Sequence, residues 1–172
     1  DLAPARPSNQ VAGLSVADAG IALEALGRMH ARWWESPKLK AKDWLPDFDS
    51  PTMRALLPVF QQCWNPYRDF MAERLSAPMR PLGDRLTACL PRILTHLTTL
   101  PVTLVHGDYR ADNFFYGEGD DAFTVVDWQI ILQGPGAFDV AYLLTGNLSV
   151  ADRRASGEAL VTMYGYGTSN AD

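Results

Sequence analysis

Residues 104–113 have the sequence LVHGDYRADN, and this stretch decides how the rest of the chain is interpreted. A short β-branched run leads into it, and FFY at 114–116 follows it. The pattern predicts a loop between two strands, with Asp108 and Asn113 five residues apart on that loop. A third predicted strand, at 122–128, carries the sequence VVDW at its end.

The turn at 117–121 is expected to join the second and third strands as an antiparallel hairpin. A hairpin folds the end of its second strand back beside the start of its first, so Asp127 is expected near Asn113. Oxygen atoms of amides and carboxylates suit Mg²⁺, and a carboxylate that stays off the metal can accept or orient the proton of an incoming hydroxyl group. Asn113 and Asp127 are therefore candidate metal ligands, and Asp108 is the candidate catalytic base.

The first hundred residues predict a helical subdomain without evident chemistry. Residues 1–13 are expected to be extended, and 36–50 is expected to be a loop that Trp44, Leu45 and Phe48 pin to the body. The spacing of apolar residues, serine caps and prolines predicts the following helices. They run from Ser15 to just before Pro37, from Ser50 to about residue 64 with a kink or break at Pro58, over 67–76, and over 82–99.

Helices are expected again after the hairpin, at about 137–146 and 149–164, with Gly165 and Gly167 stopping the second of them. The whole chain, 1–172, is predicted to be one domain. Its parts are a helical subdomain (1–100), the catalytic loop with a metal-binding hairpin (101–128), and further helices (129–172). The predicted fold class is mainly α with a small β-hairpin section, that is, α+β.

The composition is that of a globular protein, with 172 residues, 47% hydrophobic and 20% charged. The net charge of −5 and the lack of a basic run argue against a nucleic-acid partner. No apolar run approaches the roughly 20 residues of a membrane span, so no membrane association is expected. Cys63 and Cys89 lie in apolar surroundings and are predicted to be buried, reduced thiols of a cytoplasmic protein.

Four phrases of the sequence together resemble one enzyme superfamily. HGDYRADN resembles the protein-kinase catalytic loop, with Gly in place of Arg. With the other three phrases it resembles the aminoglycoside phosphotransferase and choline kinase-like (protein-kinase-like) superfamily, and more closely its ecdysteroid-kinase-like branch. The phrases are ALGRMHARWW (25–34), LVHGDYRADN (104–113), VVDWQ (125–129) and GPGAFDVAYLL (134–144).

The resemblance implies roles for individual residues. Asp108 would be the catalytic base, and Asn113 and Asp127 would hold Mg²⁺, Asp127 as the counterpart of the kinase DFG aspartate. Phe115 and Val126 would form the floor of the adenine pocket. Two further residues would support the loop: His106 would anchor it, and Asp139 would accept hydrogen bonds from the backbone near 106–108. ATP would be the co-substrate, and a small hydroxylated molecule would accept its γ-phosphate.

The resemblance covers only the carboxy-terminal lobe of such an enzyme. The amino-terminal β-lobe of a kinase supplies a Gly-rich loop and a lysine that binds the phosphates. These 172 residues contain no GxGxxG, and their only lysines are Lys38, Lys40 and Lys42, within a predicted loop. We therefore expect little activity from this chain alone, and a homodimer formed through the open cleft floor around Phe115 and Val126.

Each assignment has an alternative. Asp108 could be an ordinary turn residue, Asn113 and Asp127 could cap strand ends, and Arg110 could bind a phosphate or form a surface salt bridge. A core position is favoured for His30. Core or packed-loop positions are also favoured, over an acceptor pocket, for Trp33, Trp34, Trp44 and Trp64. Asp120 and Asp121 are expected at a solvated hairpin tip.

The function also has alternatives. The chain could be a lone lobe that serves as a non-catalytic binding or interaction module, although such a role does not require Asp108, Asn113 and Asp127 together. A metal-dependent phosphoesterase could use the same acidic cluster, but such a site usually has histidine or more carboxylate ligands. The order of the motifs favours the phosphotransferase.

Overall fold

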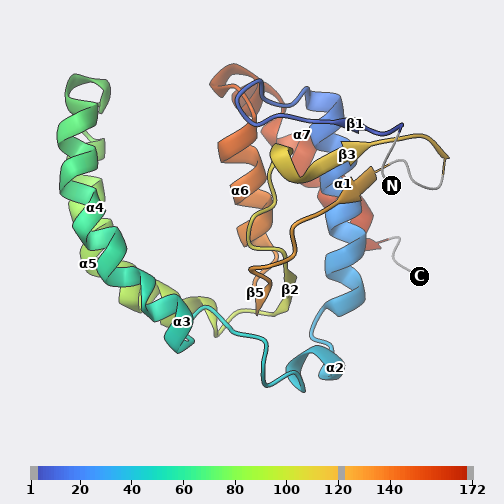
Figure 1. The fold of residues 1–172 in the computed structure, drawn as a ribbon, viewed down its shortest axis with the longest axis horizontal. Helices are drawn as coiled ribbons and strands as arrows, with labels where there is room; N and C mark the ends of the chain where they lie inside the picture. Colours follow the sequence, from blue (N-terminus) through green and yellow to red (C-terminus); the bar gives the residue numbers. More distant parts are fainter. Residues whose placement is uncertain (1–3, 120–122, 170–172) are drawn as a thin grey trace.

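The computed structural model of the chain describes residues 4–119 and 123–169. This part is mainly α-helical with two small antiparallel sheets (Figure 1), which confirms the predicted fold class. In chain order the elements are β1 (Arg6–Pro7), α1 (Val16–Trp33), α2 (Pro37–Lys40), α3 (Pro51–Arg54), α4 (Leu56–Met71), η1 (Ala72–Arg74), α5 (Met79–Leu97), β2 (Thr103–Val105), η2 (Ala111–Asn113), β3 (Phe114–Tyr116), β4 (Phe123–Val125), β5 (Leu132–Gly134), α6 (Ala137–Asn147) and α7 (Val150–Ser169).

The predicted hairpin is present. Strands β3 and β4 pair antiparallel, with Phe114 opposite Val125 and Phe115 opposite Thr124. The tip at Asp120 and Asp121 lies outside the described residues.

Two strands were missed by the sequence reasoning, and both correct the predicted organisation. β1 lies within residues 1–13, which were expected to be extended but not to pair in a sheet, and it pairs with β3. β5 lies within the segment 129–172 that was expected to be helical, and it pairs with β2. Each has only two or three residues and contains Pro or Gly, so neither shows the alternation by which a strand is recognised.

The helix starts at serine residues agree with the prediction. The side-chain oxygens of Ser15 and Ser50 accept hydrogen bonds from backbone N–H groups three residues later, at 3.0 and 3.4 Å. Ser149 does the same for Asp152 at the start of α7. These caps satisfy N–H groups that have no partner within the helix. They are predictable because the serine side chain itself makes the hydrogen bond.

The predicted end of α7 was wrong, because the helix continues through Gly165 and Gly167 to Ser169. Helices α1 and α7 pack with their backbones close together. A Cβ on Gly167 would collide with the carbonyl oxygen of Glu24 in α1, and one on Gly27 would collide with the carbonyl oxygen of Tyr164. Gly167 therefore permits close contact between α1 and α7 and does not end the helix.

The main core lies between α1, α6, α7 and the inner face of the β3–β4 hairpin. Its buried residues include Leu23, Phe114, Leu143 and Leu160 of these elements, and Tyr109 of the loop after β2. His30 is fully buried, as expected for a core residue. A second cluster, with Phe48, Leu94, Val105 and Leu132, joins the base of α5 to the β2–β5 sheet.

Residues 51–97, which we call the arm, form α3, α4 and α5 and extend away from the body of the molecule (Figure 1). Their predicted boundaries were wrong. Pro58 falls in the first turn of α4, where its missing N–H has no intrahelical partner and costs little. The expected break near residue 65 is absent, since α4 continues through Pro66 to Met71. No separate α-helix covers 67–76, where α4 ends and the short η1 follows, and α5 starts at Met79 and includes Pro91.

Several predicted burial states also need correction. Cys63 and Cys89 are exposed, because both lie on the arm, where much of the surface of each helix faces solvent. Trp34 and Trp44 are 48% and 65% exposed and therefore do not belong to the core. The loop before α3 is held to the body by Leu45 and Phe48, which are buried as predicted.

Candidate active site

The loop that carries the candidate base begins directly after β2 with His106 and Gly107, both buried. Gly107 has φ +86°, in the left-handed region that favours glycine. A Cβ at this position would also collide with the carbonyl oxygen of Ile130. The loop therefore requires glycine where the protein-kinase motif has arginine.

A buried carboxylate on α6 fixes this turn. Asp139 is fully buried, and its two oxygens accept hydrogen bonds from the N–H groups of His106, at 2.7 Å, and Gly107, at 3.0 Å. These are the hydrogen bonds that the sequence analysis expects. His30 Nε2 lies 3.4 Å from the same carboxylate, and His30 Nδ1 lies 3.0 Å from the hydroxyl of Tyr164. Tyr164 of α7 contacts His30 of α1, and His30 contacts Asp139, so both helices are linked to the loop through the Asp139 carboxylate.

The ring of His106 connects the loop to the hairpin. Its Nδ1 accepts a hydrogen bond from the N–H of Asp108 at 3.2 Å, so its Nε2 carries the proton and donates to the carbonyl oxygen of Val126 at 3.0 Å. Because backbone groups engage both ring nitrogens, the geometry favours an anchoring histidine over one that carries protons.

Three side chains surround the carboxylate of Asp108. Tyr142 donates a hydrogen bond to Oδ1 at 3.0 Å, and the amide nitrogen of Asn113 donates to Oδ2 at 3.3 Å. Arg110 Nε lies 3.1 Å from Oδ2, an ion pair that lacks the alignment of a hydrogen bond. The same asparagine nitrogen donates to the backbone carbonyl of Asp108 at 2.9 Å. The two motif residues five apart in sequence are therefore in direct contact.

Tyr142 is a residue of this site that the sequence reasoning missed. It lies one helical turn after Asp139 on α6, within the phrase GPGAFDVAYLL. Burial, and then the hydrogen bond to Asp108, raise the pKa of its phenol. The i, i+3 spacing from Asp139 was the available signal, since residues so spaced share a helix face.

Asp127 is close to this group through the backbone but does not contact it. The N–H of Val126 donates to the carbonyl oxygen of Asn113 at 3.0 Å, and Asp127 follows in a left-handed conformation with φ +66°. Its exposed carboxylate accepts a hydrogen bond from Gln129 Nε2 at 3.4 Å. Among the residues described, no hydrogen bond or ion pair joins Asp127 to Asp108 or Asn113.

These donors fit Mg²⁺ bound together with a nucleotide. The amide oxygen of Asn113 has no hydrogen bond within the described chain, since only the nitrogen is used, and Asp127 offers a carboxylate. Mg²⁺ commonly takes one or two protein ligands and completes its shell with water and phosphate oxygens. In residues 4–119 and 123–169 no three His, Cys, Asp or Glu residues lie close enough to hold a metal by themselves.

The outer face of the hairpin carries the two predicted adenine-pocket residues. Phe115 lies opposite Thr124, and Val126 follows two residues later, so Phe115 and Val126 share one face of the sheet. Both are half-buried, whereas Phe114 and Tyr116 turn inward to the core. An apolar surface therefore lies beside Asn113 and Asp127.

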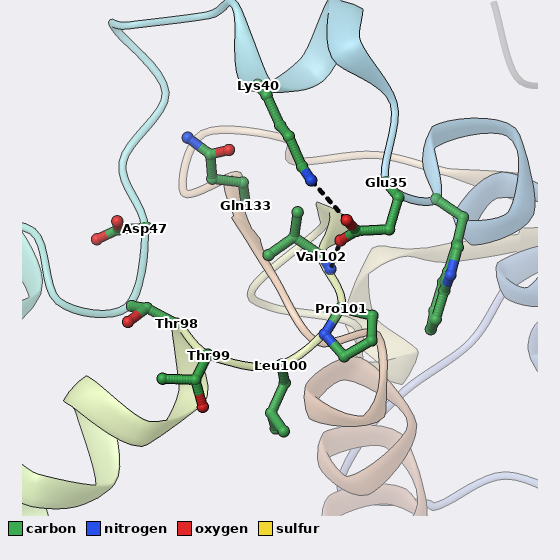
Figure 2. Close-up of a pocket in the computed structure, with 10 residues that line it drawn as sticks. Glu35, Lys40, Asp47, Thr98, Thr99, Leu100, Pro101, Val102 and Gln133 are labelled. Atoms are coloured by element: carbon green, nitrogen blue, oxygen red, sulfur yellow. Dashed lines mark hydrogen bonds and ion pairs between the residues drawn. The ribbon is translucent and has the colours of Figure 1, made fainter.

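A separate cavity lies at the other end of β2, away from this group. It measures about 570 Å³ and is lined by Glu35, Lys40, Val102 and neighbouring residues (Figure 2). Glu35 receives a hydrogen bond from Lys40 at 2.5 Å and another from the N–H of Val102 at 2.6 Å. These two interactions, the one with Lys40 first, lower the pKa of Glu35. The cavity is lined by Val102, just before the start of β2, whereas the catalytic loop follows the end of β2 at Val105. The cavity is therefore not the candidate active site.

Asp139 thus fixes the loop, and three side chains hold the carboxylate of Asp108. The sequence model described as "Phosphotransferase enzyme family" matches residues 2–172. The chain therefore belongs to this family of kinase-like enzymes, which generally use ATP and Mg²⁺, and the predicted superfamily is confirmed. The ecdysteroid-kinase-like branch stays a prediction. A comparison with curated proteins finds no match. No helix in the part of the chain described could span a membrane.

Proposed function

We propose that the chain carries the catalytic loop of an ATP-dependent kinase that transfers the γ-phosphate to a hydroxyl group of a small molecule. The observation that carries this proposal is the environment of Asp108. Its carboxylate contacts Tyr142, Asn113 and Arg110, while Asp139 fixes the backbone just before it. A carboxylate held in this way is suited to one task, to receive or orient a proton at a fixed point.

Phosphoryl transfer needs positioning and charge stabilisation more than covalent help from the protein. Asp108 would accept the proton of the acceptor's hydroxyl group, or orient that group, as the new P–O bond forms. Asn113 and Asp127 would hold Mg²⁺, which neutralises charge on the phosphates when it is bound. Asn113 would thus contact both the metal and the base, because its amide oxygen would bind Mg²⁺ while its nitrogen already donates to Asp108.

Phe115 and Val126 would contact the adenine ring from the outer face of the hairpin. Their position beside Asn113 and Asp127 would let one nucleotide reach both the apolar surface and the metal ligands. The acceptor would approach Asp108 from the side of Tyr142, a residue that is 36% exposed. Tyr142 is the residue on that side with a hydroxyl already directed at the base.

We expect weak transfer by these 172 residues alone, because the sequence shows no counterpart of the Gly-rich loop and the strand lysine with which kinases bind the nucleotide's phosphates. The three lysines of the sequence lie between residues 38 and 42, and Lys40 is paired with Glu35 at the cavity beyond the start of β2. Binding of Mg²⁺–ATP and phosphate transfer should therefore be separable in this chain.

The test is calorimetric binding of ATP with and without Mg²⁺, followed by a phosphate-transfer assay on a panel of small alcohols. Asn113→Ala and Asp127→Ala should each weaken Mg²⁺-dependent binding by about tenfold or more, the loss of one strong interaction. Asp112→Ala changes an exposed carboxylate on the same loop and should not affect binding. Nucleotide binding that is indifferent to Mg²⁺ and to both ligand variants would contradict the proposal.

A further inference from the structure

The arm has two distinct helical faces, and the first of them holds α4 and α5 together. Its centre is Trp64, whose ring lies against Gly83 so closely that a Cβ there would overlap it. The indole Nε1 of Trp64 also donates a hydrogen bond to Asp84 at 2.6 Å. This inward face leaves the second face of each helix unpartnered within the described chain.

The second face is apolar and regular. On both helices, large apolar residues and one cysteine recur at alternating spacings of three and four, the pattern of a helix seam that packs against other helices. We call these residues the stripe. It consists of Leu56, Phe60, Cys63, Tyr67 and Phe70 on α4 and of Met79, Leu82, Leu86, Cys89 and Ile93 on α5. All ten are exposed, and the eight that are not cysteine are 37–78% exposed.

The two halves of the stripe lie on the same side of the arm. Cys63 immediately precedes the inward-facing Trp64, and Leu82 immediately precedes the inward-facing Gly83. Each half is therefore rotated by the same angle from the contact between the helices. Since α4 and α5 run antiparallel, equal rotations direct both halves to one side. The result is a continuous apolar surface on a segment that extends away from the body (Figure 1).

We propose that the stripe pairs with the stripe of a second copy of this chain, so that two arms form a four-helix bundle around a two-fold axis. Two antiparallel helices with a heptad-spaced apolar face are half of such a bundle. A two-fold pairing uses the same surface on both copies and needs no other partner. None of the ten stripe residues is charged, so no charge is buried at the seam.

The area of the stripe is sufficient for a stable dimer. A half-exposed aromatic side chain offers roughly 75–125 Å², half of the about 150–250 Å² that it buries in full. Only three of the eight side chains are aromatic, and the aliphatic ones offer less, so we take roughly 75–100 Å² as the average. Eight such side chains offer roughly 600–800 Å² per copy, close to the ~800 Å² per partner of a standard interface.

The charge of the arm gives the pairing a characteristic salt dependence. Residues 51–97 contain six arginines and three acidic residues, a net charge of +3, whereas the whole chain carries −5. Two arms repel each other weakly, and salt screens that repulsion. Association of two copies should therefore strengthen as salt rises. Docking of an acidic helix or an anionic lipid surface on the same stripe would weaken instead.

The test is sedimentation of the 172-residue chain over a wide range of concentration and at two salt concentrations. Leu82→Glu places a charge in the seam and should weaken dimerisation by roughly thirtyfold or more, as expected for a central interface residue. Val161→Glu on α7 is the matched control, because Val161 is 48% and Leu82 51% exposed. It should leave the dimer unchanged, and circular dichroism checks that both variants are folded.

Alkylation of the two stripe thiols gives a second readout. Cys63 and Cys89 should react more slowly as the dimer forms. A chain that stays monomeric at every concentration would overturn the proposal, and so would thiols that are protected in a monomer. A dimer that Phe115→Glu dissociates and Leu82→Glu does not would assign association to the hairpin face. Monomers that bind anionic lipid vesicles through the stripe would assign it to membranes. The proposal does not depend on phosphate transfer.

Discussion

Asp139→Asn should destabilise the folded chain strongly, because the carboxylate has two acceptor atoms and both are used. The N–H groups of His106 and Gly107 donate to its two oxygens at 2.7 and 3.0 Å in a fully buried site. The amide of asparagine can accept only one of these hydrogen bonds. Its NH₂ group would face the other N–H, and two donors cannot bond to each other.

The size of the loss follows from these contacts. A hydrogen bond to a charged group contributes about 1.5–3 kcal/mol, and a buried donor left without a partner costs about 1–3 kcal/mol. We expect Asp139→Asn to lower the free energy of unfolding by about 3–5 kcal/mol, a large share of the roughly 5–15 kcal/mol that domains possess. Any phosphate transfer should fall as well, since the loop that carries Asp108 would lose its brace.

Urea unfolding followed by circular dichroism measures this loss. The midpoint should fall while the slope of the free energy against urea stays the same, because a similar surface is exposed on unfolding. Asp69→Asn is the control, since the Asp69 side chain is 73% exposed and should change stability by less than about 0.5 kcal/mol. A loss below about 1 kcal/mol for Asp139→Asn would refute the bracing role.

Three further predictions concern other contacts. Tyr142→Phe removes a hydrogen-bond donor to Asp108, so kcat in the transfer assay should fall several-fold while nucleotide affinity stays the same; an unchanged kcat would contradict the role of the phenol. Gly27→Ala places a methyl group against the carbonyl oxygen of Tyr164, so the free energy of unfolding should fall by about 1–3 kcal/mol, seen as a lower melting temperature. Burial, and then the charge of Asp139, raise the pKa of Tyr164 to about 12. The folded state therefore holds this proton more tightly than the unfolded state, whose tyrosines titrate near pH 10, so stability should decline as pH rises from about 10 to 12 and decline less in Tyr164→Phe.

The features that the sequence predicted correctly are those that short segments encode. Ser15 and Ser50 cap helices through their own side chains. The hairpin was predictable because two short apolar runs flank a turn of polar residues and glycine. The contact between Asp108 and Asn113 needs only the loop between β2 and β3.

The features that were missed depend on distant parts of the chain. Gly167 looked like a helix stop, but its role is set by Glu24, more than a hundred residues away. β5 could not be recognised by its own three residues, because its partner is β2. Cys63 and Cys89 were expected to be buried because their neighbours in sequence are apolar. Both cysteines and several of those apolar neighbours belong to the exposed stripe. Local patterns identify an apolar helix face but not what covers it.

The central claim is that Asp108 acts on the acceptor's hydroxyl group while Asn113 and Asp127 serve the metal and nucleotide. Its most direct test is γ-phosphate transfer by Asp108→Asn at saturating Mg²⁺–ATP, to a small alcohol of the panel that the parent chain measurably phosphorylates, with Asp112→Asn as the control on the same loop. The account predicts that Asp108→Asn binds nucleotide as the parent chain does but transfers phosphate at least roughly a hundredfold more slowly, the contribution typical of general base catalysis. Asp112→Asn should retain the parent rate. Transfer by Asp108→Asn at the parent rate would contradict the account.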